Sequence, residues 1–285
     1  MTEPAADRVQ LAADPQSAAG AQSAAGPLRA ANPLRAADDQ PAADALPAAD
    51  ALTAADALTA AKALPGAAAA PDWLRPLVHN ATSVRLPGPL AGNAAATADS
   101  RSSAVLILFS DGTGTGGTGK PDVLITARAD TLRAHAGQPA FPGGRAEPGE
   151  EPIATALREA NEETGLDPSS VTPLLQLREL YLGHSDYRVV PIVGYWSTPG
   201  RVWAADPAET AAVARVPIAQ LVDPSRRGRV RLSQGLLAPA FEVGDLIVWG
   251  FTALLLDAVL ELGGWNRPWL PGRDLVLPRD SVVIR

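Results

Sequence analysis

The stretch that decides the fold spans residues 141 to 166 and reads FPGGRAEPGEEPIATALREANEETGL. Two adjacent glycines and a Pro-Gly pair mark a turn-rich loop in its first third. Pro152 then suits the first turn of a helix, where its missing N–H is not needed. Gly165 stands where a left-handed helix cap is expected. The pattern predicts a loop followed by a helix over Pro152–Thr164.

This helix would present three carboxylates on one face, because Glu159, Glu162 and Glu163 are spaced i, i+3 and i+4. Like charges at this spacing repel by roughly 0.2–0.5 kcal/mol per pair, and the C-terminal half of a helix disfavours anions. One interpretation is a solvated acidic face. The other is a site for Mg²⁺ or Mn²⁺, which prefer carboxylate and water oxygens. Glu150 could then swing in from the loop, and Arg158 could orient a neighbouring carboxylate through its planar fork.

The same residues resemble the Nudix box, G-x5-E-x7-R-E-U-x-E-E-x-G-U, in which U is apolar. The fixed positions are all matched, at Gly144, Glu150, Arg158, Glu159, Ala160, Glu162, Glu163, Gly165 and Leu166. The resemblance implies an α/β fold, a Nudix-type α/β/α sandwich with a mixed sheet. It further implies a diphosphatase, a metal-dependent hydrolase acting on a nucleoside diphosphate linked to another moiety.

The resemblance also implies roles for the residues of the box. Glu159 and Glu163 would be the principal ligands of Mg²⁺ or Mn²⁺, with Glu162 beside them and Glu150 as the supporting ligand from the loop. Arg158 would hold the glutamate side chains in place. The catalytic base is open: the candidates are Glu159 itself and Glu209 in a downstream loop, with Asp206 as a further alternative.

Upstream of the box, residues 124–144 read LITARADTLRAHAGQPAFPGG. This is similar to the signature of the coenzyme A pyrophosphatase branch, L-L-T-x-R-[SA]-x3-R-x3-G-x3-F-P-G-G, with Ile125 replacing Leu. The implied reaction cleaves the pyrophosphate bond of coenzyme A or a derivative, giving 3′,5′-ADP and 4′-phosphopantetheine. Arg128 and Arg133 could contact phosphate, beside a substrate-binding Gly143 and Gly144, although Arg128 could equally pair with a nearby carboxylate.

Two other functions stay open at this point. A Nudix pyrophosphatase of ADP-ribose or dinucleotides would share the box without the upstream signature. A non-catalytic Nudix binding module would share the fold, although such modules commonly lose the box glutamates, which this chain retains. The oligomeric state is not indicated, and a homodimer is compatible with the sequence.

Five strand-like runs and a second helix accompany the box, and strands interleaved with helices favour a mixed α/β sandwich. The segment Asp111–Pro121 between the first two runs contains GTGGTGK, which resembles a phosphate-binding P-loop. Pro121 replaces its magnesium-binding Ser or Thr and a strand follows, so we expect a hairpin connection instead. The expected strands are Ser103–Phe109, Val123–Ala127, Leu174–Tyr181, Tyr187–Trp196 and Ala211–Val216, and the second helix is Val248–Leu262.

The first 70 residues differ in composition from the rest of the chain. They contain no aromatic residue, and from Val9 to Lys62 they repeat every six residues as x-x-x-Ala-Ala-x. So little apolar area cannot offset the entropy of ordering the chain, and the prolines would break a continuous helix. We predict a disordered Ala/Pro-rich tail over residues 1–70 and one domain over residues 71–285.

The whole-chain composition narrows the function further. A formal net charge of −7 over 285 residues argues against a nucleic-acid-coating surface. The chain has no cysteine, which excludes disulfides and thiolate metal sites. No apolar run reaches the length of a membrane span, and the N-terminus lacks the pattern of a secretory signal. We therefore expect a cytoplasmic protein with a small-molecule partner and neither nucleic acid nor membrane.

Overall fold

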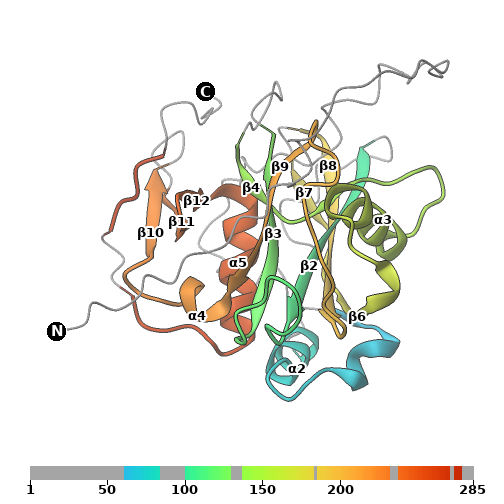
Figure 1. Cartoon of the computed structure of the whole chain (residues 1–285), viewed down its shortest axis with the longest axis horizontal. Coiled ribbons are helices and arrows are strands. Elements are labelled where there is room, and N and C mark those ends of the chain that lie inside the picture. Colours follow the sequence, from blue (N-terminus) through green and yellow to red (C-terminus); the bar gives the residue numbers. More distant parts are fainter. Residues whose placement is uncertain are drawn as a thin grey trace, which may run out of the picture.

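The computed structural model describes residues 61–83, 100–129, 137–182, 185–231, 237–269 and 273–277. The described part is built around a nine-stranded mixed sheet with helices on both faces (Figure 1). The strands of this sheet are β1 (Lys62–Ala63), β2 (Arg101–Ser110), β3 (Asp122–Arg128), β4 (Pro139–Ala140), β5 (Gly143–Arg145), β6 (Val171–Gln176), β7 (Leu180–Leu182), β8 (Tyr187–Trp196) and β9 (Thr210–Pro217).

The sheet has β2 and β8 at its centre, paired in parallel over nine residues of each strand. The other pairings are antiparallel: β6 with β8, β2 with β3 and β5, and β3 with β9. Parallel strands need a crossover that passes over a face of the sheet. The helix α3 (Pro152–Thr164), which has the bounds that the sequence predicted, lies in this crossover with its buried side against β2.

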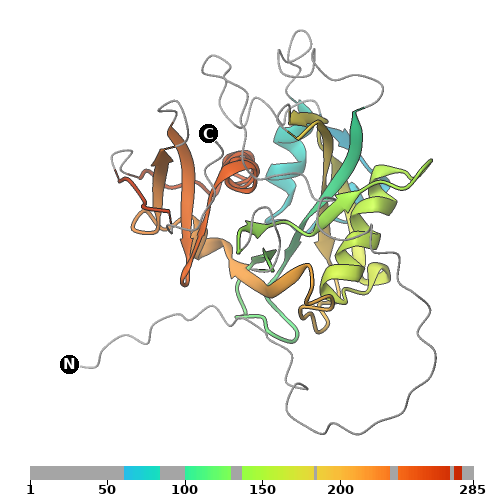
Figure 2. The same ribbon diagram turned by 90° about the horizontal axis from the view of Figure 1, so that it is seen from above.

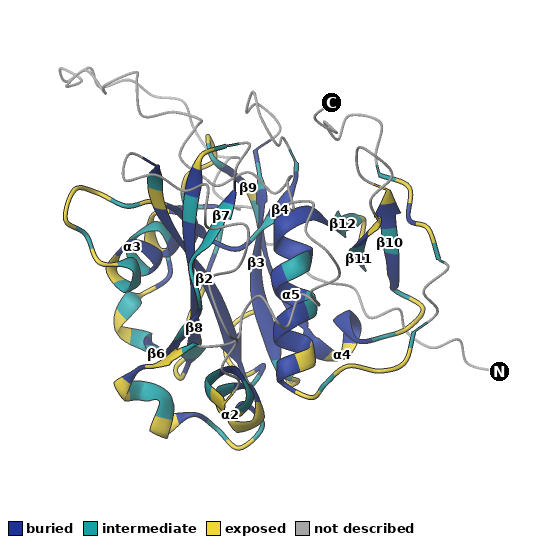
Figure 3. Cartoon of the chain, turned by 180° about the vertical axis from the view of Figure 1, so that it is seen from behind, coloured by how far each residue is buried: buried dark blue, intermediate teal, exposed yellow. Residues whose placement is uncertain are grey.

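The alternation of side chains along β2 divides the core into two layers. Ala104, Leu106 and Leu108 face α3, whereas Val105, Ile107 and Phe109 face the opposite layer. That layer contains α2 (Arg75–Ser83) and α5 (Gly250–Leu262), and α5 is almost wholly buried (Figure 3). Viewed from above, α3 and α5 lie on opposite sides of the sheet (Figure 2). The predicted α/β/α sandwich is confirmed.

A smaller antiparallel sheet lies beyond α5, on the side away from β3 (Figure 2). One of its faces joins the core through Phe241, Val243 and Val248, and the other carries its own cluster around Val230. Its strands are β10 (Arg227–Arg231), β11 (Leu237–Val243) and β12 (Leu246–Val248); the short helix α4 (Ile218–Leu221) precedes them, and the 3-10 turns η1 (Pro65–Ala69) and η3 (Pro168–Ser170) complete the described elements.

The structure corrects three of the predicted boundaries. The second helix begins at Gly250, since Val248 ends β12 and Trp249 is extended. The run Leu174–Tyr181 is divided between β6 and β7, which both pair with β8. Residues 61–70, assigned to the tail, form β1 and η1, and β1 pairs with β6.

The rest of the predicted tail, up to residue 60, lies outside the described residues. Within the described residues, none of the helices has both the length and the apolar character that a bilayer crossing requires.

Candidate functional site

The loop and helix at residues 143–164 carry the predicted metal-binding residues. β5 pairs with β2 and carries Gly143 and Gly144 at the point where α3 crosses the sheet. A Cβ atom at Gly144 would lie 2.5 Å from Glu159 Oε2. Glycine at this position therefore lets the Glu159 carboxylate lie directly over the strand.

Both ends of α3 are fixed by local interactions. Pro152 occupies the first turn, and Gly165 adopts the left-handed conformation with φ 65° and donates its N–H to the Asn161 carbonyl. The last carbonyl groups of the helix accept bonds from the loop before β9: Trp203 N–H bonds Thr164 O at 3.1 Å, and Ala205 N–H bonds Glu163 O at 2.9 Å. These bonds attach that loop to the end of the helix that carries the carboxylates.

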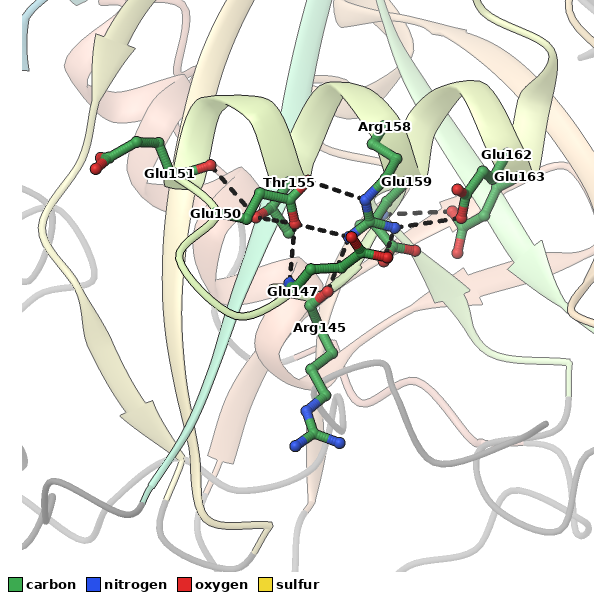
Figure 4. A network of polar contacts seen from close by, with 10 residues as sticks. Arg145, Glu147, Glu150, Glu151, Thr155, Arg158, Glu159, Glu162 and Glu163 are labelled. Atoms are coloured by element: carbon green, nitrogen blue, oxygen red, sulfur yellow. Dashed lines mark hydrogen bonds and ion pairs between the residues drawn. The ribbon is translucent and has the colours of Figure 1, made fainter. Parts of the chain in front are cut away.

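Arg158 is the centre of a charged network along α3 (Figure 4). Its Nε donates to Glu150 Oε1 at 2.9 Å and its Nη2 to Glu150 Oε2 at 3.0 Å, a two-pronged contact. Its Nη1 donates to Glu159 Oε1 at 2.7 Å and to the more exposed Glu162 at 3.3 Å. The guanidinium lowers the pKa of Glu150 to about 2, chiefly through these hydrogen bonds. Arg158 therefore contacts three carboxylates at once.

Glu159 and Glu163 are the buried acids of the site. The Glu159 side chain is 13% exposed, and burial raises its pKa to about 7 despite the Arg158 guanidinium. Glu163 is 1% exposed and accepts a 3.3 Å bond from the Gly143 N–H. Burial raises the Glu163 pKa well above its usual value, and the neighbouring Glu159 charge raises it further. Both acids resist ionisation in this setting.

Two predicted residues outside the box approach these acids. Glu209 raises the pKa of both Glu159 and Glu163 by charge repulsion, and Arg128 lowers that of Glu163 by attraction. The backbone brings these residues near one another, because the Ala129 N–H donates to Glu209 O at 2.8 Å where β3 ends and β9 begins. Arg133, the other predicted phosphate contact, lies outside the described residues.

The donor set suits a hard divalent cation. Carboxylate oxygens are the ligands that Mg²⁺ and Mn²⁺ favour, and a cation would relieve the repulsion among Glu159, Glu163 and Glu209. Among the described residues, no three acidic or histidine side chains converge as the ligands of a bound ion would. The carboxylates of Glu159 and Glu162 are turned toward Arg158 instead. The residues fit such a cation through their chemistry, charge and burial.

Two contributions to the site were not predicted from the sequence. The Arg145 carbonyl accepts a 2.9 Å bond from Arg158 Nη2, while the Arg145 side chain points away from the network (Figure 4). Backbone acceptors of this kind leave no mark in a sequence. The Thr155 hydroxyl, which bonds Glu150, was also missed. Its spacing of three from Arg158 was the available signal, because it places both residues on one helix face.

The glycine-rich segment Asp111–Pro121 lies elsewhere and connects β2 to β3, as expected. Arg215 anchors it by donating to the carbonyls of Thr113 and Thr115 at 2.8 and 3.0 Å. Arg215 also pairs with Asp122 at 3.0 Å. Asp122 and Arg128 are the two ends of β3, so this loop is at the far end of that strand from the carboxylates.

Comparison with known proteins agrees with this arrangement. A model of the NUDIX domain matches residues 100–235. The chain is 40% identical over 151 residues to the uncharacterized Nudix hydrolase NudL of Photorhabdus laumondii, covering 50% of this chain and 77% of that protein. NudL of Yersinia pestis is 36% identical over 144 residues, covering 48% and 70%. A solved Nudix hydrolase of M. smegmatis, RenU, is 23% identical with a TM-score of 0.35, covering 43% and 73%.

The matched region contains the whole of α3 and its loop, and the aligned parts cover more than two thirds of both NudL proteins. The intact glutamates and the charged network around Arg158 thus lie in a domain shared with these relatives. The chain belongs to the Nudix family and is a Nudix hydrolase, an enzyme that acts on phosphorus anhydrides.

Proposed function

We propose that this enzyme hydrolyses the pyrophosphate bond of coenzyme A or a derivative, with Mg²⁺ or Mn²⁺ held by Glu159, Glu163 and Glu162. The observation that carries the catalytic part is the burial of Glu159 and Glu163 side by side, with Glu209 close to both. Burying several like charges in one place is costly unless a cation joins them. Nudix hydrolases in general use divalent metal ions.

The choice of substrate rests on the segment before the box. Residues 124–144 match the coenzyme A signature except at Ile125, and the structure places the start of this segment in β3, which ends at Arg128 beside the acids. Coenzyme A carries a pyrophosphate and a 3′-phosphate, so it requires cationic contacts near an acidic metal site. Arg128 and Arg133 are the residues proposed to supply them.

Each residue of the site has a defined task in the proposed reaction. Glu150 and Arg158 orient Glu159, and the glycines of β5 leave room for its carboxylate. A bound Mg²⁺ or Mn²⁺ would polarise the phosphoryl oxygens and acidify the attacking water. Glu209, half-buried in the loop before β9, is the carboxylate left to accept a proton from that water.

Product analysis tests this proposal. The full chain is incubated with Mg²⁺ or Mn²⁺ and with coenzyme A, ADP-ribose or NADH, and the products are identified by mass spectrometry. We expect 3′,5′-ADP and 4′-phosphopantetheine from coenzyme A, and loss of both products on chelation of the metal. Cleavage of ADP-ribose or NADH without cleavage of coenzyme A would overturn the substrate. Binding of these compounds without turnover would indicate a non-catalytic module.

A further inference from the structure

Thr155 is a buried polar residue at a position that the Nudix box leaves unspecified. It is 0% exposed, and its hydroxyl donates to Glu150 Oε2 at 2.9 Å. The same hydroxyl lies 3.3 Å from the Glu151 carbonyl, an acceptor one turn back on the helix. A hydroxyl has one proton to donate, and the shorter contact is to the charged acceptor. The geometry therefore favours Glu150 as the partner.

The Glu150 carboxylate is held from three directions. The Glu147 N–H donates to Oε2 at 3.0 Å and closes the turn before the helix. Arg158 contacts both carboxylate oxygens, and Thr155 adds the third contact from the first turns of α3. Thr155 and Arg158 are three residues apart and share a helix face. Thr155 therefore gives Glu150 a second attachment to the helix, independent of Arg158.

This attachment reaches the buried acid through one intermediate. The two-pronged contact with Glu150 fixes the plane of the Arg158 guanidinium, and the remaining nitrogen, Nη1, donates to Glu159 Oε1 at 2.7 Å. A tilt of Glu150 would therefore turn the guanidinium and move the Glu159 carboxylate. Figure 4 shows Thr155, Glu150, Arg158 and Glu159 as successive members of this chain of bonds.

We propose that Thr155 is a positioning residue of this enzyme: its hydroxyl locks Glu150, so that Arg158 holds the Glu159 carboxylate over β5 and beside Glu163, where the two acids would take up the metal. The inference rests on the proposed function through the role of Glu159 as a metal ligand. Thr155 itself touches neither the metal nor the substrate.

Three variants of the full chain separate this role from packing. Thr155→Val removes the hydroxyl and keeps the shape of the side chain, whereas Thr155→Ser keeps the hydroxyl and removes the methyl group. Thr164→Val is the matched control. Thr164 lies on the same helix, is also 0% exposed, and donates its hydroxyl at 2.6 Å to the Ala160 carbonyl, outside the charged network.

Isothermal titration with Mn²⁺ measures metal binding independently of turnover, and steady-state kinetics on coenzyme A give kcat and KM. Loss of a hydrogen bond to a charged group corresponds to roughly a tenfold effect. We expect Thr155→Val to weaken Mn²⁺ binding and lower kcat by about that factor, with KM changed by less than about twofold. Thr155→Ser and Thr164→Val should match the wild type in both measurements.

Retention of Mn²⁺ affinity and kcat by Thr155→Val, with only a lower melting temperature, would overturn the inference and assign the hydroxyl to the Glu151 carbonyl. Equal impairment of Thr155→Ser and Thr155→Val would also overturn it, because the methyl group would then be responsible. A wild-type chain that binds no Mn²⁺ would instead refute the proposed function. If the wild type binds Mn²⁺ but cleaves another diphosphate, the same variants are compared on that substrate.

Discussion

Glu159 and Glu163 are acids that the fold buries beside one another, at a cost that a cation would offset. Their pKa values are raised chiefly by burial, whereas that of Glu150 is lowered by Arg158. The helix α3 and the loop before it thus hold carboxyl groups whose pKa values are shifted in opposite directions, although they lie close together in the sequence. Glu150 is therefore an ionised anchor for Arg158, whereas Glu159 and Glu163 are acids whose ionisation a bound metal ion would favour.

The stability of the metal-free protein should fall between pH 5 and pH 8. Glu159 keeps its proton in the folded state up to about pH 7, whereas the unfolded chain releases it near 4.5. The folded state therefore binds the proton more tightly, and stability decreases by up to roughly 3 kcal/mol as the pH rises through this window. Glu163 acts in the same direction, and Glu150 acts only below this window.

Thermal unfolding in the presence of a chelator, recorded from pH 5 to pH 8, measures this effect. Glu159→Gln should flatten the dependence, and added Mn²⁺ should oppose it increasingly at higher pH because it binds the ionised acids. A melting temperature that rises steadily over the same range in the wild type would contradict the assignment of these buried acids.

Gly144→Ala should damage the site more than the fold. The added Cβ would meet Glu159 Oε2 at 2.5 Å, and the end of a flexible side chain is what can move away. Displacing a metal-binding carboxylate by about 1 Å lowers turnover by roughly 100-fold. Kinetics and thermal melts check this, with Gly200→Ala as the control, since a Cβ there meets nothing within 4 Å. Normal turnover in Gly144→Ala would show that activity does not depend on the present position of the Glu159 carboxylate.

At the scale of elements, α3 was predictable residue for residue because its signals are local: a proline in its first turn and a glycine at its cap. Strand-like apolar runs, which are also local, predicted β2, β3, β8 and β9 to within two residues at either end. The second helix was begun two residues early, because the apolar run through β12 continues into α5 without a break in hydrophobicity.

Features that depend on distant contacts were not predictable in the same way. The segments α2 and β10 are short, and tertiary packing rather than local pattern gives them their structure. Glu209 was proposed from resemblance alone. Its loop is held near Glu163 by backbone hydrogen bonds, one to Ala129 and others to the end of α3, which the sequence does not reveal. The contacts of Arg215 likewise depend on distant segments, because Arg215 in β9 bonds the loop at Thr113 and Thr115 and pairs with Asp122 in β3.

Arg215→Met should destabilise the protein without acting directly on the carboxylate site. The side chains of Arg215 and Asp122 are 4% and 2% exposed, so the change leaves a buried carboxylate without its cation and costs about 3–5 kcal/mol. Urea unfolding measures the loss. The double variant Arg215→Met, Asp122→Asn should recover part of it, and an unchanged midpoint in the single variant would contradict the structural role given to this pair.

For the molecule as a whole, residues 61–70, which the composition assigned to the tail, carry β1 and η1 and pack with the domain. Three leucines of this region are buried: Leu64 just before η1, Leu74 just before α2, and Leu77 within α2. The helix α2 packs in the same layer as α5. The change in composition near residue 70 reflects the distribution of the aromatic residues, the first of which is Trp73. Short alanine-rich segments such as η1 can still pack when a strand pairing holds them, as β1 does here.

Two truncations test this boundary. Removing residues 1–60 should leave both melting temperature and turnover unchanged, because the hexad repeat offers little apolar area. Removing residues 1–83 also deletes three buried leucines, each contributing roughly 1.5–3 kcal/mol, and should give an unstable or insoluble protein. Loss of activity on removal of residues 1–60 would show that the tail contributes to the site. A stable protein after removal of residues 1–83 would show that the fold does not need α2.

The metal site is tested most directly by a Mn²⁺ titration of the wild type and of Glu163→Gln, monitored by electron paramagnetic resonance. Glu261→Gln, an exposed change on α5 across the sheet, serves as the control. We expect that Glu163→Gln stays folded, binds Mn²⁺ at least about tenfold more weakly and loses turnover, while the control matches the wild type. Wild-type Mn²⁺ affinity and turnover in Glu163→Gln would contradict the proposed metal site.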